Sequence, residues 1–184
     1  MRYNIMLDGL PTEYEGYLIR TDFRIGMQIS EVLNDVNLAE PEKMYKAYEL
    51  LYGSGVPSDR ETAIGGLQWF MRGGEEENDN SHSDGKPPVF DFEQDNRLVY
   101  SAFRARFGID LTRERLHWFA FLAMLSDLGG CSLSEVMSIR STDLSKLSGE
   151  QQKHYAELKE RYKIQQPLSD AEQAMIAEFE EQLG

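Results

Sequence analysis

Three carboxylates at alternate positions, Asp91, Glu93 and Asp95, lie in the stretch VFDFEQDNRLVYSAFRARFGIDL. Oxygens with this spacing suit a divalent cation, but acids also stabilise the first turn of a helix, where backbone N–H groups lack partners. A calcium loop of the EF-hand type beginning at Asp91 needs glycine at its sixth position and glutamate at its twelfth, where this chain has Asn96 and Ala102. We therefore predict that the acids begin a helix and do not form a metal site.

Side chains that could act as nucleophiles or bases are few and scattered. Cys131 is the single cysteine, and a thiol with no base held nearby is more often a small buried hydrophobe than a catalytic group. The three histidines, His82, His117 and His154, occur singly, and we expect His117 to be a satisfied core or interface residue. The glycine pairs lack the partner residues of phosphate-binding loops. We predict a non-enzymatic protein without a cofactor.

Composition and charge limit the kinds of partner. The 184-residue chain is 41% hydrophobic, enough to form a core, and its formal net charge is −13 at pH 7. This charge repels phosphate backbones and anionic lipid, so we expect neither nucleic-acid nor membrane binding. The longest apolar run, LHWFAFLAML, is about half as long as a membrane span, and the N-terminus lacks the pattern of a signal peptide. The cytoplasm is the predicted location.

Basic side chains form one cluster in the sequence. It comprises Arg104, Arg106, Arg113 and Arg115, which are interleaved with acids. This mixture, in so acidic a chain, indicates solvated faces or a protein interface and not a DNA-reading surface.

The composition changes at GGEEENDNSHSDGKPP, residues 73–88, which contains no large apolar side chain. Such a stretch buries too little surface to offset the entropy lost when it is ordered. We predict a flexible acidic linker or long loop there, including the loop residue His82, between an N-terminal segment (1–72) and a C-terminal segment (89–184). The two segments form either separate domains or one packed body.

The N-terminal segment is expected to begin with a β-hairpin. Apolar side chains alternate over residues 3–7, Asp8-Gly9 supplies a turn, and a second strand follows at 17–19.

Three helical patterns complete this segment. The first follows Asp22, which can cap a helix, and the second begins at Pro41 and is closed by Gly53. The third starts at Ser58, which has capping-box spacing to Glu61.

The C-terminal segment shows helical patterns only. Capping-box spacing recurs at Ser132-x-x-Glu135, Ser148-x-x-Gln151 and Ser169-x-x-Glu172. The pattern over residues 111–128 has almost no polar face, which is typical of a helix at the centre of a bundle or in an interface. We predict a mainly α protein, a helical bundle with a short N-terminal β-hairpin, whose C-terminal helices span residues 91–107, 111–128, 133–139, 149–163 and 169–183.

An ordered set of short sequences in this segment resembles the Gp-fifteen family of siphophages and prophages of Gram-positive bacteria. In chain order the set is FDFEQD, GIDL, LHW, IRS and DLS. The likeness covers about residues 90–163, and GYLIRTDFRIGMQISEVLND and LQWFMRGG extend it weakly toward the N-terminus.

The resemblance implies a small, mainly helical, non-enzymatic protein of the phage tail-gene cluster, generally a tail assembly chaperone. Such a chaperone keeps the tape-measure protein soluble and helps to recruit tail-tube subunits, so the implied location is the cytoplasm of the infected cell and not the mature virion. The alternative is a structural tail or neck component that the virion retains.

Four apolar side chains are candidate anchors for such a partner. They are Trp118, Phe121, Met124 and, as a weaker candidate, Trp69. Large aromatic side chains contribute much of the binding energy in many interfaces, and an amphipathic partner helix would need an apolar surface of this kind. The alternative is that Trp118 and Phe121 only fill the core.

Overall fold

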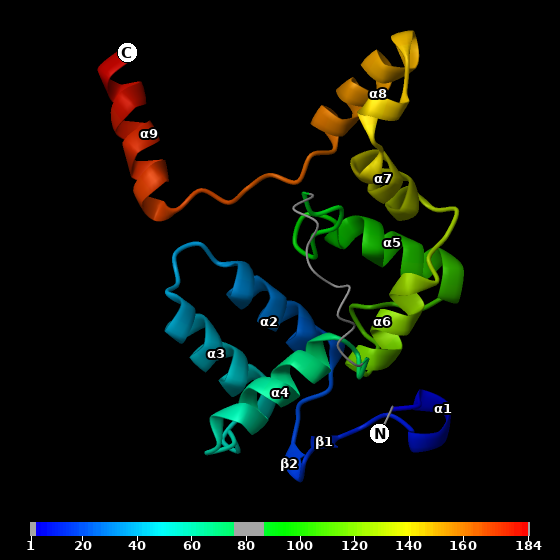
Figure 1. The fold of residues 1–184 in the computed structure, drawn as a ribbon, viewed down its shortest axis with the longest axis vertical. Helices are drawn as coiled ribbons and strands as arrows, with labels where there is room; N and C mark the ends of the chain where they lie inside the picture. Colours follow the sequence, from blue (N-terminus) through cyan, green and yellow to red (C-terminus); the bar gives the residue numbers. More distant parts are fainter. Residues whose placement is uncertain (1–2, 76–86, 184) are drawn as a thin grey trace.

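The computed structural model describes residues 3–75 and 87–183, and it is mainly helical with one short hairpin, which confirms the predicted fold class. In chain order the elements are α1 (Ile5–Asp8), β1 (Glu13–Tyr14), β2 (Tyr17–Leu18), α2 (Phe23–Asn34), α3 (Glu40–Tyr52), α4 (Arg60–Met71), α5 (Asn96–Phe107), α6 (Trp118–Ser126), α7 (Ser132–Ser141), the 3₁₀ turn η1 (Leu144–Lys146), α8 (Gly149–Arg161) and α9 (Asp170–Leu183). Helix α3 packs on both α2 and α4, α6 packs on α2, and α7 packs on both α5 and α8 (Figure 1).

The two-stranded antiparallel hairpin lies near the N-terminus, as expected. Tyr14 of β1 pairs with Tyr17 of β2, and the turn between them is Glu15-Gly16, with φ of 48° and 83°. Positive φ at both central positions is the geometry of two-residue turns that match the twist of the flanking strands. Only the second of the two predicted strands is close to its expected place.

The strand predicted over residues 3–7 is wrong, because this stretch enters helix α1. Asn4 caps the helix by accepting a hydrogen bond from the N–H of Met6 (2.9 Å), and the Asp8 carboxylate accepts one from the N–H of Asn4 (2.7 Å). These local bonds satisfy the first N–H groups of a helix, and over so short a stretch they outweigh an alternating apolar pattern.

The next three helices begin and end close to the predicted residues. Asp22 caps α2, a proline stands in the first turn of α3, and Gly53 ends α3. The capping residue predicted for α4 is wrong by one position, since the Asp59 carboxylate, and not Ser58, accepts the N–H of Thr62 (2.9 Å). A carboxylate is favoured there because it also interacts with the positive end of the helix.

Helix α5 starts at Asn96, with Asp95 in the N-cap position, so the acids precede a helix as predicted, but none lies in its first turn and the Asp95 side chain makes no capping hydrogen bond. The start lies later than the predicted residue 91, because a turn precedes the helix. In this turn the Asp91 carboxylate accepts a hydrogen bond from the N–H of Gln94 (2.8 Å).

The helix predicted over residues 111–128 is wrong in its first half, since α6 begins at Trp118. The chain before it is tied to the start of α2. The N–H of Phe23 donates to the carbonyl of Leu116 (2.9 Å), and the N–H of Trp118 donates to the carbonyl of Thr21 (2.7 Å). Because these tertiary bonds use backbone groups that a continuous helix would need, the helix cannot extend toward the N-terminus.

The later helices follow the predicted spans within a few residues, but their caps differ. Cys131, and not Ser132, occupies the N-cap of α7, and Ser148 stands before α8 without a capping hydrogen bond from its side chain. The capping box predicted for α9 is confirmed, because the N–H of Ser169 donates to the Glu172 carboxylate (2.8 Å) and the N–H of Glu172 donates to the Ser169 hydroxyl (3.3 Å).

Most of the predicted linker, including His82, lies outside the described residues, which omit 76–86. Its first residues continue from α4 and pack against the core. A Cβ atom at Gly74 would lie 2.8 Å from the ring of Phe119, so only glycine allows this close approach.

A single aromatic core contains residues from both segments. Gly26 in α2 lets the Trp118 ring lie directly against the helix backbone, because a Cβ atom there would lie 2.4 Å from ring atoms. The stacked ring pairs are Phe23 with Phe121, Phe70 with Trp118, Phe103 with Phe121, and Trp118 with Phe121.

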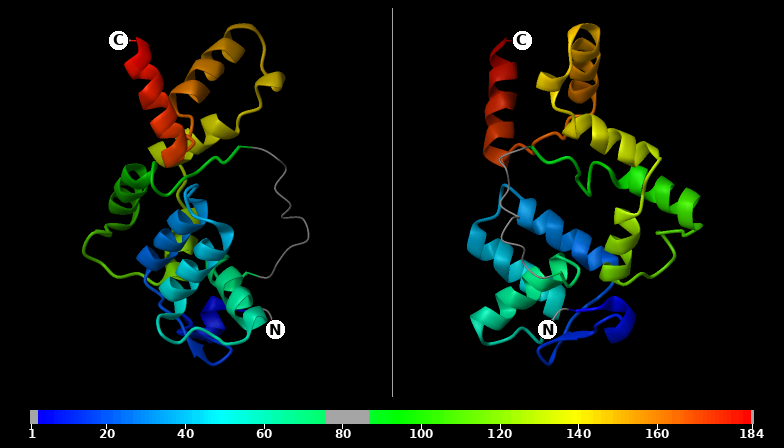
Figure 2. Two further views of the ribbon diagram at one scale, coloured as in Figure 1. Left: turned by 90° about the vertical axis from the view of Figure 1, so that its left-hand side faces the viewer. Right: turned by 45° about the vertical axis from the view of Figure 1, so that its right-hand side comes forward.

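Helices α8 and α9 project from one end of the molecule, whereas α1 and the hairpin lie at the other end (Figures 1 and 2). Helix α8 has no buried residue. None of the helices in residues 3–75 and 87–183 combines the length and the apolar character that a membrane crossing requires.

Candidate partner-binding surfaces

The four predicted anchor residues lie in or against the core. Trp118 and Phe121 are 1% and 0% exposed and fill the core in this conformation. Met124 and Trp69 are partly buried beside it, and the Trp69 ring contacts Phe119 edge to face (5.0 Å between centroids). A partner can reach the two fully buried side chains only if the core opens, so surfaces elsewhere offer more accessible contacts.

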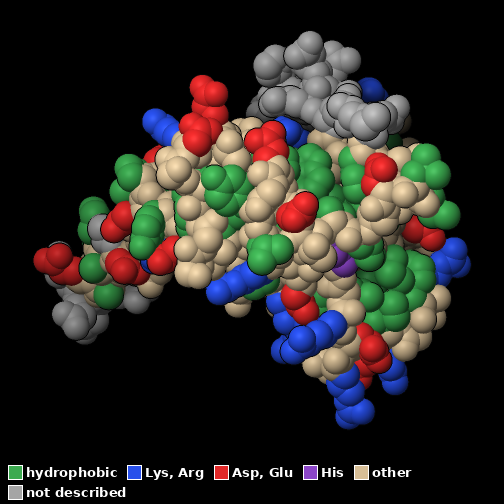
Figure 3. Space-filling model, turned by 90° about the horizontal axis from the view of Figure 1, so that it is seen from below, with side chains coloured by type: hydrophobic (Ala, Val, Ile, Leu, Met, Phe, Trp, Pro, Cys, Tyr) green, Lys and Arg blue, Asp and Glu red, His purple; other side chains and the backbone are tan. Residues whose placement is uncertain are grey.

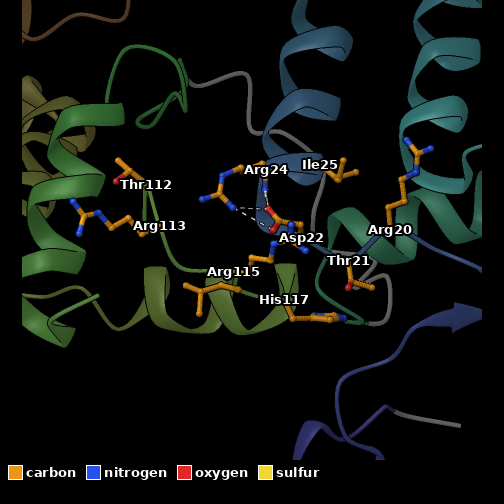
Figure 4. Close-up of a pocket in the computed structure, with 10 residues that line it drawn as sticks. Arg20, Thr21, Asp22, Arg24, Ile25, Thr112, Arg113, Arg115 and His117 are labelled. Carbon is orange, nitrogen blue, oxygen red and sulfur yellow. Dashed lines mark hydrogen bonds and ion pairs between the residues drawn. The ribbon is translucent and has the colours of Figure 1, made fainter. Parts of the chain in front are cut away.

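An open pocket of about 740 Å³ lies where the start of α2 meets the chain that precedes α6. We call it the arginine pocket, because Arg20, Arg24, Arg113 and Arg115 line it around a single acid, Asp22. Figure 4 shows Arg24 and Asp22 joined in its middle, with Arg113 and Arg115 to one side and Arg20 to the other. The lining therefore has a local charge of +3 in a chain of net charge −13.

Arg24 and Asp22 form a clamp at the pocket, called here the outer clamp. The Arg24 guanidinium donates to both oxygens of Asp22 (3.1 and 3.2 Å) and to the carbonyls of Leu111 (2.6 Å) and Glu114 (3.1 Å). Asp22 also caps α2 by accepting the N–H of Arg24 (3.0 Å). The two side chains are 40% and 30% exposed. The outer clamp holds the loop before α6 against the first turn of α2.

The other arginines of the pocket are less constrained. Arg113 is 3.8 Å from Asp110, and neither Arg20 nor Arg115 forms an ion pair with another residue of the described ranges. In the view of Figure 3, Lys and Arg side chains lie on the part of the face near a histidine, with Asp and Glu side chains between them. The pocket therefore presents positive charge that the described part of the chain does not neutralise.

His117 lies at the edge of the arginine pocket and caps α6. Its Nδ1 accepts the N–H of Phe119 (3.1 Å), so the proton of the neutral ring is on Nε2, which donates to the carbonyl of Pro11 (2.7 Å). Burial lowers the pKa of His117, and the bond to Pro11 opposes this effect only in part. Both ring nitrogens therefore have hydrogen-bond partners, which confirms the part of the expectation that His117 is a satisfied residue.

A second clamp joins Asp95 to Arg140 and is called the inner clamp. The guanidinium donates to both Asp95 oxygens (2.6 and 2.9 Å) and to the carbonyls of Tyr162 (2.6 Å) and Val89 (3.1 Å). The Arg140 and Asp95 side chains are 9% and 2% exposed. This bidentate pair connects α7, the start of α5 and the chain on either side of them.

The inner clamp supports the walls of a second hollow, a cleft of about 900 Å³ between the C-terminal half of α2, residues 88–94 and residues 164–168. We call it the acidic cleft. Its charged lining residues are Glu31, Asp35, Asp91 and Glu93, and no Lys, Arg or His lines it within the described ranges. Its apolar lining residues are Val32, Val36, Pro88, Phe90, Phe92, Ile164, Pro167 and Leu168.

Two reciprocal pairs of side-chain hydrogen bonds fix the walls of the acidic cleft. The Gln94 side-chain amide donates to the backbone carbonyl of Gln165 (2.9 Å) and accepts a hydrogen bond from the backbone N–H of Gln165 (2.8 Å). The Asn37 side-chain amide likewise donates to the Asp170 carboxylate (3.2 Å) and accepts a hydrogen bond from the backbone N–H of Asp170 (2.9 Å). The second pair fixes the start of α9 beside the loop that follows α2.

A family model described as Bacteriophage Gp15 protein matches residues 6–164. The chain belongs to this family. Membership confirms the resemblance seen in the sequence and indicates a part in phage structure or morphogenesis. Comparisons with curated proteins and with solved structures found no match.

The family match covers most, but not all, of this Gp15-family protein. Both clamps and the arginine pocket lie within the matched residues, whereas helix α9 lies beyond them. The matched part thus includes the packed body, and α9 lies outside the matched residues.

Two features of this Gp15-family protein were missed in the sequence. The role of Arg140 was missed, because the residues that it joins are far apart in the chain. Asp91 and Glu93 were assigned to a helix start, but their side chains line the acidic cleft. In the described part of the chain, no group of three or more His, Cys, Asp or Glu side chains could hold a metal ion.

Proposed function

We propose that this Gp15-family protein is a non-catalytic tail assembly chaperone or adaptor that binds the tape-measure protein and tail-tube subunits during tail morphogenesis. It acts in the cytoplasm of the infected bacterium and is absent from the mature virion. Family membership supports the phage role, and the exposed apolar side chains support the partner-binding role.

The observation that carries the proposal is that helix α9 leaves its large apolar side chains in solvent. Met175 is 71% exposed and Phe179 is 62% exposed, and Ile176 between them is also exposed. Exposed apolar residues are common singly, but residues three and four apart lie on one helix face and form a stripe. An amphipathic helix with an unburied stripe is a typical contact for a partner helix.

A second exposed apolar group lies at the opposite end of the molecule. Met6 and Leu7 in α1 are 87% and 83% exposed, and Leu18 of the hairpin is also exposed. Two apolar surfaces at opposite ends suit an adaptor that must contact a long partner and a subunit at the same time.

Co-expression followed by affinity purification tests the proposal directly. The tagged chain is produced with the tape-measure protein, or with the tube protein, of the same phage, and we expect both to be co-purified. A variant with Met175→Ser and Phe179→Ser should retain the fold and lose part of the binding. If neither tail protein is retained by the wild-type chain, the proposal fails.

Mass spectrometry of purified virions tests the predicted absence from the particle. A chaperone should be present in the infected-cell lysate and missing from the virion. Stoichiometric presence in the virion would instead identify a structural tail or neck component.

A further inference from the structure

The acidic cleft combines apolar walls with charge of one sign only. Its four acids belong to two separate segments, with Glu31 and Asp35 at the end of α2 and Asp91 and Glu93 in the turn before α5. Helix α2 also directs its C-terminal, negative end into this region. Any group that enters the cleft therefore meets a negative potential from several directions.

Two of the apolar side chains of the cleft are clearly unburied in the isolated chain. Val36 and Leu168 are 48% and 45% exposed, and they come from opposite walls. A volume of about 900 Å³ accepts several large side chains. The cleft is thus an apolar groove without an occupant from the described part of the chain.

Helix α9 extends this groove. Gln173 in its first half lines the cleft, and Ile176, three residues later, lies on the same face of the helix. By its sequence the helix contains no Lys or Arg and has acids at Asp170, Glu172, Glu178, Glu180 and Glu181. The groove and the helix therefore share one pattern, an apolar surface with acidic neighbours.

We infer that the acidic cleft and α9 together bind an amphipathic helix of a partner protein, whose apolar stripe is flanked by Lys or Arg. The apolar stripe fills the cleft and covers Ile176 and Phe179, and the basic side chains pair with the acids at the rim. The inference rests on the proposed adaptor function in one respect, since it names the chemistry of the protein partner that the adaptor holds.

Charge and shape disfavour other occupants. Nucleic acid carries the same charge as the cleft and is repelled. A second copy of the chain has a net charge of −13, and its arginine pocket is a hollow that cannot enter another hollow. A protruding basic helix has both the opposite charge and a shape that can enter the cleft.

Binding of two synthetic helical peptides to the full-length protein tests the inference. Each peptide has about 18 residues, with leucine on one face, and carries lysine on the other face in the first peptide and glutamate in the second. We expect fluorescence anisotropy to show binding of the lysine peptide, weakened by added salt, and none of the glutamate peptide. Equal binding of both peptides, or binding of neither, overturns the inference.

Charge-reversal variants locate the site. Glu31→Lys with Glu93→Lys replaces two exposed acids of the cleft, and we expect the dissociation constant of the lysine peptide to rise by about tenfold. The matched control is Glu13→Lys with Glu15→Lys, which makes the same change in net charge on the hairpin at the other end of the molecule. Equal weakening by both double variants would show a general charge effect and overturn the cleft as the site.

Apolar variants separate the contribution of α9. Ile176→Ser with Phe179→Ser should weaken the lysine peptide, and the control, Met6→Ser with Leu7→Ser, should not. All four side chains are exposed, so circular dichroism and the melting temperature should remain those of the wild type. Unchanged binding by the α9 variant overturns its part in the site.

The outcomes distinguish this inference from the proposed function. If the tape-measure protein binds equally well to the wild type and to the cleft variant, the adaptor function stands and the inference falls. If the lysine peptide requires the cleft but no tail protein is co-purified, the binding site stands and the proposed function falls. A concentration-dependent dimer that the cleft variant abolishes would make a second copy the occupant and overturn the inference.

Discussion

The outer and the inner clamp have the same design in two different environments. Each joins an aspartate in the N-cap position of a helix to an arginine that also binds two backbone carbonyls. The outer clamp, Asp22 with Arg24, is about one third exposed, whereas the inner clamp, Asp95 with Arg140, is almost fully buried. Burial, and not the number of hydrogen bonds, should decide how much each clamp matters for stability.

The physical reason is the cost of an unpaired charge. In water an aspartate that loses its arginine is simply solvated, so an exposed pair contributes little. In the protein interior the remaining carboxylate has no water to replace its partner, and the loss is severe. The two clamps allow this difference to be measured within one chain.

The largest effect is expected for Arg140→Met in the inner clamp. The variant leaves Asp95 buried without its partner and should lower the free energy of unfolding by about 3–5 kcal/mol, measured by urea denaturation. The double variant Arg140→Met with Asp95→Leu removes both charges and should recover part of this loss. A single variant as stable as the wild type would contradict the assigned role of burial.

The next effect is expected for Gly26→Ala, between the two ends of α2. The new methyl group would lie 2.4 Å from the Trp118 ring, and the displacement should cost about 1–3 kcal/mol in thermal or urea unfolding. Gly129→Ala is the matched control, because a Cβ atom there would meet nothing within 4 Å. Equal stability of the two variants would show that Trp118 moves freely.

A smaller effect is expected for Arg24→Met in the outer clamp. Because this pair is partly exposed, the free energy of unfolding should fall by only about 1 kcal/mol, although Arg24 makes as many contacts as Arg140. Arg115→Met, which removes an arginine without an ion pair in the described ranges, is the control and should have no measurable effect. A loss as large as that of Arg140→Met would remove the distinction between the clamps.

The smallest effect concerns pH and is confined to the region of the outer clamp, where His117 lies. Because burial lowers its folded-state pKa below the usual 6.5, the unfolded chain binds the proton more readily. The stability that neutral His117 contributes is therefore complete above about pH 6.5, and it is lost progressively as the pH falls below that value through the lower folded-state pKa.

His117→Asn tests this pH dependence, since asparagine is a good N-cap and does not titrate. Urea unfolding at pH 7.5 and at pH 5.5 should show a smaller loss of stability for the variant than for the wild type. The same loss in both proteins would show that another group controls the pH dependence.

The sequence predicted the helices better than it predicted what ends them. Local signals such as Asp22 and Gly53 identified their helices because capping depends on neighbours in the chain. The helix predicted at 111–128 failed because residues 21–23, about ninety positions away, take its backbone bonds. The spacing of apolar residues within residues 111–128 gives no sign of so distant a hydrogen-bond partner.

The same limit applies to the candidate surfaces. Trp118 and Phe121 were chosen for their type, but side-chain type does not distinguish a core residue from an interface residue. The acidic cleft was not found, because its walls come from three segments that meet only in the folded chain. The exposed stripe of α9, in contrast, lies within one helix, so helical spacing alone places its residues on one face.

The placement of the two hollows on α2 makes the molecule sensitive to ionic strength. The arginine pocket lies at the first turn of this twelve-residue helix and the acidic cleft at its last turns, roughly 18 Å apart along the axis. At physiological salt the screening length is about 8 Å, so an approaching protein interacts electrostatically with only the nearer of the two hollows. In about 0.01 M salt the screening length reaches about 30 Å, so the arginine pocket and the acidic cleft act on an approaching molecule together. The protein then orients charged neighbours as a single dipole before any contact is made.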